Sequence, residues 1–182
     1  MLPVGPLMVE HRLIEKMVPL ILKEVAEARR LGRINLHFVD MAVDFIRSYA
    51  DQCHHGKEEE ILFRELSQKP LSPEHGRIMA ELVEEHRLTR KTVGELIDAA
   101  ADLKKGDGSA LAAVTERLKG IAEFYPPHIE KEDKRFFLPV MDYFSATERE
   151  ALLREESDFD KNFVHRLYKD KLSAAGRLIA AG

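Results

Sequence analysis

The sequence predicts an all-α fold, an up-down-up-down bundle of four helices followed by one additional helix. Three observations predict it. Apolar residues recur every three to four positions through five long stretches, short turn signals separate these stretches, and no stretch alternates apolar and polar residues as a strand does. Helices joined by short loops pack as antiparallel neighbours. The chain has 182 residues, which is enough for one domain with a substantial core.

The first two helices are predicted from about Pro6 to Leu31 and from about Leu36 to Leu66. Gly32 is suited to end the first helix because glycine readily adopts the left-handed conformation of a helix C-terminus. Pro19 lies inside this helix and predicts a bend there, since proline lacks the N–H that the helix needs.

The third helix is predicted from Pro73 to about Leu103, with Ser72 as its N-cap. The fourth is predicted from Ser109 to about Tyr143, and we expect Pro126-Pro127 to interrupt it. Such a break would free backbone carbonyls near the middle of the bundle.

The fifth helix is predicted from Ser145, whose spacing to Glu148 matches a capping box, to about Leu172. Residues 1–143 would form the bundle, and residues 144–182 an amphipathic helix packed on it with a frayed tail. Apolar residues at helical spacing predict the packed face. They are Leu152, Phe159, Phe163, Leu167 and Leu172. A contact between two copies of the chain, or with a protein partner, is the alternative use of this face.

Composition excludes several classes of function. The formal net charge is −4 with both signs interspersed, which argues against nucleic acid as a partner. No run of about 18 apolar residues predicts a membrane span. Cys53 is the only cysteine, so neither an intramolecular disulfide nor a cysteine zinc cluster is possible. The first residues lack the pattern of a signal peptide, and we expect a cytoplasmic protein, either a monomer or a homodimer.

Each of the four bundle helices carries one histidine in phase with its apolar stripe, and two of them add a glutamate four residues later. The inward set is His11, His55, Glu59, His86, His128 and Glu132. Isolated carboxylates are costly to bury, and no inward lysine is predicted beside them. A pair of metal ions would supply the missing positive charge. Imidazole and carboxylate ligands suit iron, manganese or zinc.

An internal repeat supports this site. The letters EHRL occur at Glu10–Leu13 and at Glu85–Leu88, and "HGKEEEILF" resembles "HIEKEDKRF". His11 precedes His55 by 44 positions and His86 precedes His128 by 42. Two similar helical hairpins would therefore meet with each metal taking two histidines and sharing both glutamates.

Other polar residues near these positions have less certain roles. Glu58 is a spare ligand candidate, and Tyr125 would either donate a hydrogen bond into the site or fill core volume. Arg90 would pair with a carboxylate, guard the access route, or lie exposed with its stem over apolar surface. Glu10 and Glu85 would accept hydrogen bonds from neighbouring histidines or lie on the surface.

The remaining candidates are expected on the surface or in packing positions. His54 lies about 100° from the predicted inward face, so it is expected to be solvated. The other histidines with that expectation are His37, His75 and His165. Asp133 is expected on the surface or beside a ligand, and Cys53 is expected to be an inert packing thiol.

From about Met8 to Val140 the chain resembles the hemerythrin-like, or HHE cation-binding, family. The stretches that carry the resemblance are "CHHGKEEEILF" and "HIEKEDKRFFLP". The resemblance implies a hemerythrin-like bundle with a non-haem di-iron centre, bridged by carboxylates and a solvent-derived oxygen. The implied ligands are His11, His55, Glu59, His86, His128 and Glu132, with zinc or manganese as the alternative metals.

Two departures refine what the resemblance implies. Oxygen-carrying hemerythrins have a second histidine one turn along the third helix, where this chain has Arg90. They also use an aspartate five residues after the fourth-helix histidine; Asp133 is available, but Glu132 is better phased. The resemblance therefore favours a protein that binds or reacts with O2, NO or peroxide, in stress response or iron handling, over reversible O2 storage.

No catalytic residue beyond the metal ligands is predicted. Any turnover would be that of a di-iron oxidoreductase acting on NO or peroxide. The alternatives are a metal-dependent oxygen or iron sensing module without turnover, and a structural dizinc site.

Overall fold

The computed structural model describes residues 2–180, with side chains described through residue 169 apart from residue 168. This part of the chain is mostly helical, with short turns between the helices, and contains no strand. Its elements are α1 (Val4–Leu31), α2 (Leu36–Asp44), η1 (Phe45–His55), η2 (Glu58–Phe63), α3 (Arg64–Leu66), α4 (Pro73–Lys104), α5 (Ala110–Lys131), η3 (Glu132–Phe136), α6 (Phe137–Val140), η4 (Met141–Tyr143) and α7 (Ala146–Ala180). Of these, η1, η2 and η3 are π-helical and η4 is a 3₁₀ turn.

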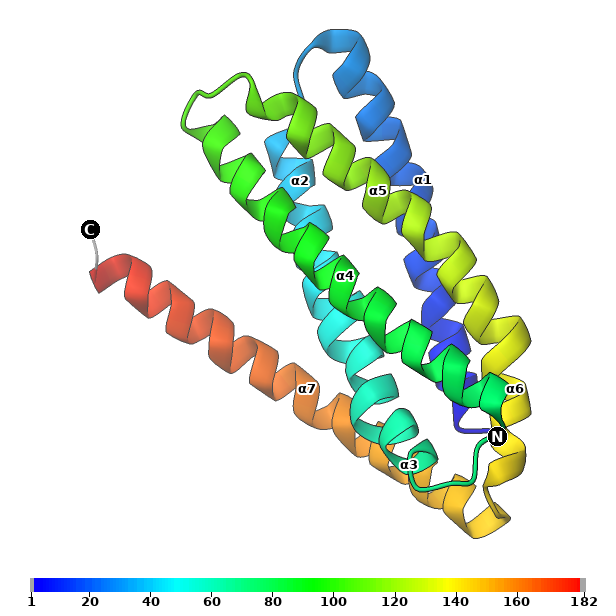
Figure 1. Cartoon of the computed structure of the whole chain (residues 1–182). Helices are drawn as coiled ribbons and strands as arrows, with labels where there is room; N and C mark the ends of the chain where they lie inside the picture. Colours follow the sequence, from blue (N-terminus) through cyan, green and yellow to red (C-terminus); the bar gives the residue numbers. More distant parts are fainter. Residues whose placement is uncertain (1, 181–182) are drawn as a thin grey trace.

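Four long helical rods form the predicted up-down-up-down bundle (Figure 1). The first rod is α1, the second runs from α2 through α3, the third is α4, and the fourth runs from α5 through η4. The first rod packs on α5 and on η1, and α4 packs on α5 and on the second rod. The all-α prediction is therefore confirmed.

Local signals mark the starts and ends of the helices where the sequence predicts them. Gly32 has a φ of 65° and its N–H donates to the carbonyl of Ala28 at 2.9 Å. The hydroxyl of Ser72 accepts from the N–H of His75, with Pro73 at the first helical position. The fifth helix begins with Ser145, whose hydroxyl accepts from the N–H of Glu148, as in a capping box.

The predicted interruption at Pro126-Pro127 is wrong. Both prolines lie inside α5, which is continuous from Ala110 to Lys131, just as Pro19 lies inside a continuous α1. Proline removes one N–H donor, but its φ is compatible with a helix. The helical residues on either side of each proline pack on other rods, and this packing keeps the backbone helical.

The second rod differs from the prediction in its helix type. It was expected to be α-helical from about Leu36 to Leu66, yet most of residues 45–63 are π-helical, and so are residues 132–136 of the fourth rod. In a π-helix each N–H bonds to the carbonyl five residues earlier, so each turn holds more than 3.6 residues. A helical phase counted at 3.6 residues per turn therefore drifts along this rod.

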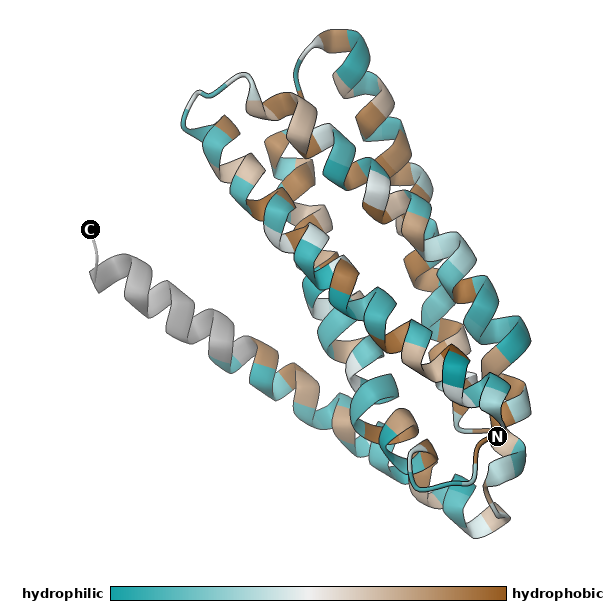
Figure 2. Cartoon of the chain, in the orientation of Figure 1, coloured by the Kyte–Doolittle hydropathy of each residue, from teal (hydrophilic) through white to brown (hydrophobic). Residues whose placement is uncertain are grey.

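Two apolar clusters fill the bundle, one on each side of a polar layer. The cluster on the side of the α1–α2 connection includes Ile14, Val93 and Ile121, and the cluster on the side of α3 includes Leu7 and Leu82. His11 lies between Leu7 and Ile14 on α1, in the gap between the clusters. Figure 2 shows hydrophobic and hydrophilic residues alternating along every rod, as amphipathic helices require.

Helix α7 packs on the π-helical part of the second rod. Leu152 is buried, and Phe159 joins the same apolar cluster as Leu152. A Cβ added to Gly56 would lie 3.0 Å from the Phe159 ring, so a glycine is needed for this close approach. Leu172 and most of the predicted frayed tail lie outside the residues whose side chains are described.

We predict that Gly56→Leu destabilises the protein by more than about 1 kcal/mol, because the new side chain would push Phe159 and α7 away from the second rod. Gly120→Leu is the matched control, since a Cβ there meets nothing within 4 Å and leucine has the better helix propensity. Chemical denaturation of both variants measures the difference. Equal stabilities would show that α7 does not depend on this contact.

Candidate metal centre

Seven buried side chains from four rods meet in the polar layer between the two apolar clusters. We call this set the histidine-carboxylate layer. Its members are His11, His54, His55, Glu58, His86, His128 and Glu132, and each is at most 2% exposed. They fall into two groups whose potential ligand atoms lie within 4.8 Å of one another: His11 with His54, Glu58 and Glu132, and His55 with His86 and His128. Within residues 2–180 these are the two fully buried groups of this kind.

Each of the two carboxylates faces histidines from both hairpins. One oxygen of Glu58 lies 3.3 Å from Nε2 of His54, and its other oxygen lies 3.4 Å from Nε2 of His86. Likewise, one oxygen of Glu132 lies 3.1 Å from Nε2 of His11 and the other 3.3 Å from Nε2 of His128. Each carboxylate therefore has one oxygen near an imidazole nitrogen of each hairpin.

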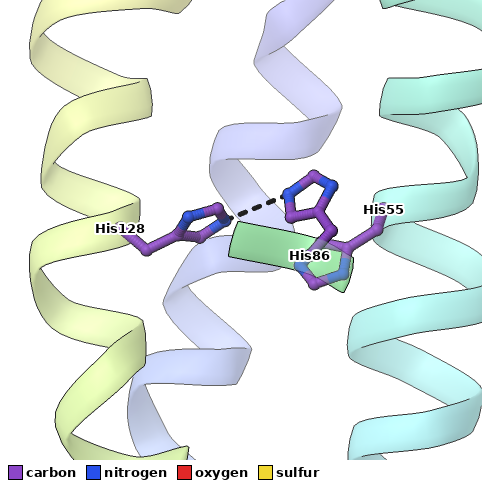
Figure 3. A group of neighbouring side chains, drawn as sticks. All are labelled: His55, His86 and His128. Atoms are coloured by element: carbon purple, nitrogen blue, oxygen red, sulfur yellow. Dashed lines mark hydrogen bonds between the residues drawn. The ribbon is translucent and has the colours of Figure 1, made fainter. Parts of the chain in front are cut away.

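The spacing suits ligands of a metal ion. Two ligand atoms that bind one ion at about 2.1 Å and at right angles lie about 3 Å apart. The separations from the imidazole nitrogens to the carboxylate oxygens are close to this value, and Nε2 of His86 lies 3.2 Å from Nε2 of His128 (Figure 3). Figure 3 also shows His55 beside His86. The two rings are stacked, with their centroids 3.8 Å apart.

Seven of the inward atoms of the layer lack hydrogen-bond partners. Within the described residues, Nε2 of His11, His54 and His55 and all four carboxylate oxygens of Glu58 and Glu132 are buried without one. Buried polar groups are nearly always hydrogen-bonded, and an unpartnered one costs about 1–3 kcal/mol. Seven such atoms pointing at one another form a set of lone pairs suited to cations.

The outward nitrogen of every histidine in the layer faces a carboxylate. His11 Nδ1 pairs with Asp133 at 2.8 Å and His54 Nδ1 with Glu10 at 2.9 Å. On the other hairpin the corresponding contacts are His86 Nδ1 with Glu59 at 2.7 Å and His128 Nδ1 with Glu85 at 2.8 Å. His55 Nδ1 is 3.4 Å from Asp51. A carboxylate that accepts from Nδ1 leaves Nε2 as the metal-binding nitrogen and fixes the ring.

This geometry agrees with the comparison against family models. Residues 2–138 match the model of the hemerythrin HHE cation binding domain. The chain belongs to this family. Searches of curated proteins and of solved structures found no match. The hemerythrin HHE domain thus covers all four rods, and its cation-binding character agrees with the histidine-carboxylate layer.

The two hairpins of this hemerythrin HHE domain are related residue by residue. His54, Lys57, Glu58 and Glu59 have the same roles as His128, Lys131, Glu132 and Asp133, as their contacts show. The ammonium groups of Lys57 and Lys131 pair with Glu10 and Glu85, the glutamates that precede His11 and His86. The equivalent of His55 in the other hairpin is Ile129, so His55 breaks the symmetry.

The structure places five of the six predicted ligands in the layer. Glu59 is not among them: its side chain is 27% exposed, and it accepts from His86 Nδ1 and from Arg90. Glu58 lies at the inward position instead. The prediction that His54 is solvated is wrong, since His54 is 1% exposed. Both differences follow from the π-helical phase of the second rod.

A sequence signal could have found this register. Aligning "HHGKEEE" with "HIEKED" on their lysines, with no gap, pairs His54 with His128 and Glu58 with Glu132. The repeat of "HGKEEEILF" and "HIEKEDKRF" instead pairs His55 with His128 and leaves the lysines unmatched. His37 and His165 are exposed as predicted, whereas His75 is partly buried and contacts the Tyr143 hydroxyl.

The charges of the layer are strongly coupled in the metal-free chain. Burial and the nearby Glu132 carboxylate raise the pKa of Glu58 well above its usual value. Burial would also raise the pKa of Glu132, but His128 and His11 hold it well below the usual value. Burial lowers the pKa of His54 to about 4, which favours the neutral imidazole that a metal requires.

A second charged cluster, formed around the buried Lys57, connects the layer to α7. It contains Glu10, Lys57, Glu156 and Asp160, and we call it the Lys57 cluster. Lys57 is fully buried, although no inward lysine was predicted, and its ammonium contacts Glu10 and lies 2.8 Å from Asp160. Because this lysine pairs outside the layer, it does not neutralise Glu58 or Glu132.

Other predicted residues support the layer from outside. Arg90 binds Asp51 at 2.7 Å and Glu59 at 2.8 Å, so it pairs with carboxylates as one of its predicted roles required. Burial raises the pKa of the Cys53 thiol to about 12, which agrees with an inert packing residue. Within residues 2–180 no helix is both long and apolar enough to span a bilayer.

We predict that Glu156→Gln changes how stability depends on pH. Burial raises the pKa of Glu156 from 4.5 to about 8, despite Lys57 and with the charges of Glu10, Asp160 and Glu155 acting in the same direction as burial. Between these pH values the folded chain binds more protons than the unfolded chain, so the wild type loses stability as pH rises. Glutamine cannot ionise, and the variant should gain about 1–3 kcal/mol relative to wild type from pH 5 to pH 8.5.

Urea denaturation of both metal-free proteins at each pH measures this difference. Glu150→Gln is the control, because Glu150 lies exposed on the same helix. A stability difference that stays constant across the pH range would contradict the assignment of a protonated Glu156.

Proposed function

We propose that this protein is a non-haem di-iron protein whose centre binds O2, NO or peroxide and reacts with at least one of them. The observation that carries the proposal is the histidine-carboxylate layer with its seven buried, unpartnered donor atoms. The family match supports cation binding in general. Three further features support a di-iron centre in particular. They are the number of donors, the two carboxylates that face both hairpins, and the carboxylates that bind the outward nitrogens of the imidazoles.

One ion would take Nε2 of His11 and His54, and the other would take Nε2 of His86 and His128. Glu58 and Glu132 would each offer one oxygen to each ion, as their contacts with the four imidazoles suggest. His55 would be an additional ligand of the second ion, because its unpartnered Nε2 lies in the same group as His86 and His128. We therefore propose Glu58 in place of Glu59.

The donor set favours iron over a structural zinc pair. Structural zinc sites are closed, four-coordinate and mostly built from cysteine. Here the second ion would have five protein donors, which fits the larger coordination number of iron or manganese. Bound iron would supply the redox chemistry. The chain's residues would hold the ions about the shared carboxylates. The outward carboxylates would fix the orientation of the imidazole rings and leave Nε2 as the ligand atom, and the two apolar clusters would exclude bulk water.

A sensing module is the second candidate function, and the Lys57 cluster favours it. The contacts run from His54 through Glu10 and Lys57 to Asp160 on α7. An ion bound by His54 would fix that ring and, through these contacts, the position of α7. In that case metal loading would change the docking of α7 with no turnover.

We predict that Glu58→Gln and Glu59→Gln have different effects on metal content. Removing a shared carboxylate takes one oxygen from each ion, so Glu58→Gln should hold at most one ion per chain after loading with iron. Glu59→Gln should still hold two, with an affinity about 10–100-fold lower, because it removes only the acceptor behind His86. Elemental analysis after desalting measures both. If Glu59→Gln loses both ions and Glu58→Gln keeps them, Glu59 is the shared carboxylate, as the sequence analysis predicted.

We predict that the protein from its native source contains close to two iron ions per chain. After anaerobic reduction, exposure to O2, NO or peroxide should restore or change its near-ultraviolet charge-transfer absorption within seconds to minutes. Optical spectroscopy and elemental analysis of one preparation test this together. Two zinc ions would indicate a structural site, and iron that responds to none of the three molecules would favour the sensing module.

A further inference from the structure

A cavity of about 400 Å³ reaches the histidine-carboxylate layer from one side. Its walls include the layer residues His55 and His86, and the apolar side chains Ile46, Val93 and Ile97. Arg90 lies at this cavity and is held by Asp51 and Glu59. The volume falls in the range of small-molecule sites and far exceeds that of one water molecule.

The cavity lies where the two hairpins carry different residues at equivalent positions. His86 and Thr89 face it on α4, and the equivalent residues of α1 are His11 and Ile14. Ile14 and Ile129 are both buried in the apolar cluster, so bulky side chains occupy the positions equivalent to Thr89 and His55. The two halves of the layer therefore differ, and the half with three histidines is the one that borders the cavity.

Tyr125 adds a hydrogen-bond donor to this cavity. It lies one turn before His128 on α5, is 3% exposed, and lines the cavity together with His55 and His86. Its hydroxyl is buried and has no hydrogen-bond partner. A buried hydroxyl without a partner is destabilising, and a phenylalanine would fill the same volume without that cost.

We propose that this cavity is the site where a small anionic ligand reaches the metal centre, and that the Tyr125 hydroxyl is the positioning donor that holds it there. The inference rests on the proposed function, since the ligand needs the bound metals. The chemical class is a small anion or an anionic form of a small oxygen or nitrogen species, with azide as the probe. Tyr125 would donate to the ligand atom, and the apolar walls would exclude competing water.

The first test is azide titration of the iron-loaded protein, followed by its charge-transfer absorption. Tyr125→Phe should raise the Kd of azide about three- to tenfold, the effect of one lost hydrogen bond, with two iron ions per chain retained. Tyr49→Phe is the matched control, because Tyr49 lies outside the cavity, and it should leave the Kd unchanged. In the metal-free protein Tyr125→Phe should keep or raise the melting temperature, whereas removing a hydroxyl that stabilises the fold would lower it.

The second test changes the cavity and leaves the tyrosine in place. Gly94 lines the cavity, and a Cβ there meets nothing within 4 Å, so Gly94→Leu should fold and narrow the cavity. It should slow azide association at least threefold with the iron content unchanged. Gly94→Ala is the control, with little added volume and an association rate close to wild type.

The outcomes separate the two proposals. If the wild type binds two iron ions and azide, but both variants match it in Kd and association rate, the cavity and Tyr125 are not the ligand site. If Tyr125→Phe lowers the melting temperature of the metal-free protein and leaves azide binding unchanged, Tyr125 is a packing residue. If the wild type takes up no iron, the proposed function itself fails, and this inference fails with it.

Discussion

Two carboxylates in a dry interior are the constraint on which this protein depends. Glu58 and Glu132 are fully buried, and their oxygens face imidazole nitrogens from four rods. Desolvating a carboxylate costs several kcal/mol unless a charge or hydrogen bonds compensate it. The buried lysine nearest in sequence, Lys57, is already paired with Glu10 and Asp160. Bound cations would compensate both carboxylates at once.

Duplication explains how so many donors reach one layer. Each hairpin supplies a glutamate-histidine pair on one rod and a histidine, lysine and two acidic residues on the next. The second acidic residue, Glu59 or Asp133, binds the histidine of the opposite hairpin. Each half thus fixes imidazoles of the other half, and the layer forms only when the hairpins meet. His55 is outside this relation, and the cavity lies on its side of the layer.

The sequence predicts the four rods and their ends, but it does not predict the register of the second rod from apolar periodicity. The four rods and their ends follow from apolar periodicity and from local signals at Gly32, Ser72 and Ser145, which act within a few residues. The register of the second rod was not predictable in the same way. Its π-helical turns change which side chains face inward, so the prediction placed His54 in solvent and took Glu59 as the inward carboxylate, with Glu58 only as a spare ligand. Helix type there depends on packing across the whole bundle.

The Lys57 cluster gives α7 a position that the apolar pattern alone would leave weakly specified. Among the α7 residues whose side chains are described, Leu152 and Phe159 of the apolar face join the core cluster, whereas Asp160 meets a fully buried ammonium group. Lys57 needs both of its carboxylates, since a buried charge that loses one partner is strongly destabilising. One of those partners, Glu10, also accepts from His54. The same glutamate therefore orients a residue of the layer and anchors the lysine that holds α7. Displacement of α7 would remove one carboxylate from Lys57 and leave Glu10 as its remaining acidic partner, so the packing of α7 and the orientation of His54 depend on each other.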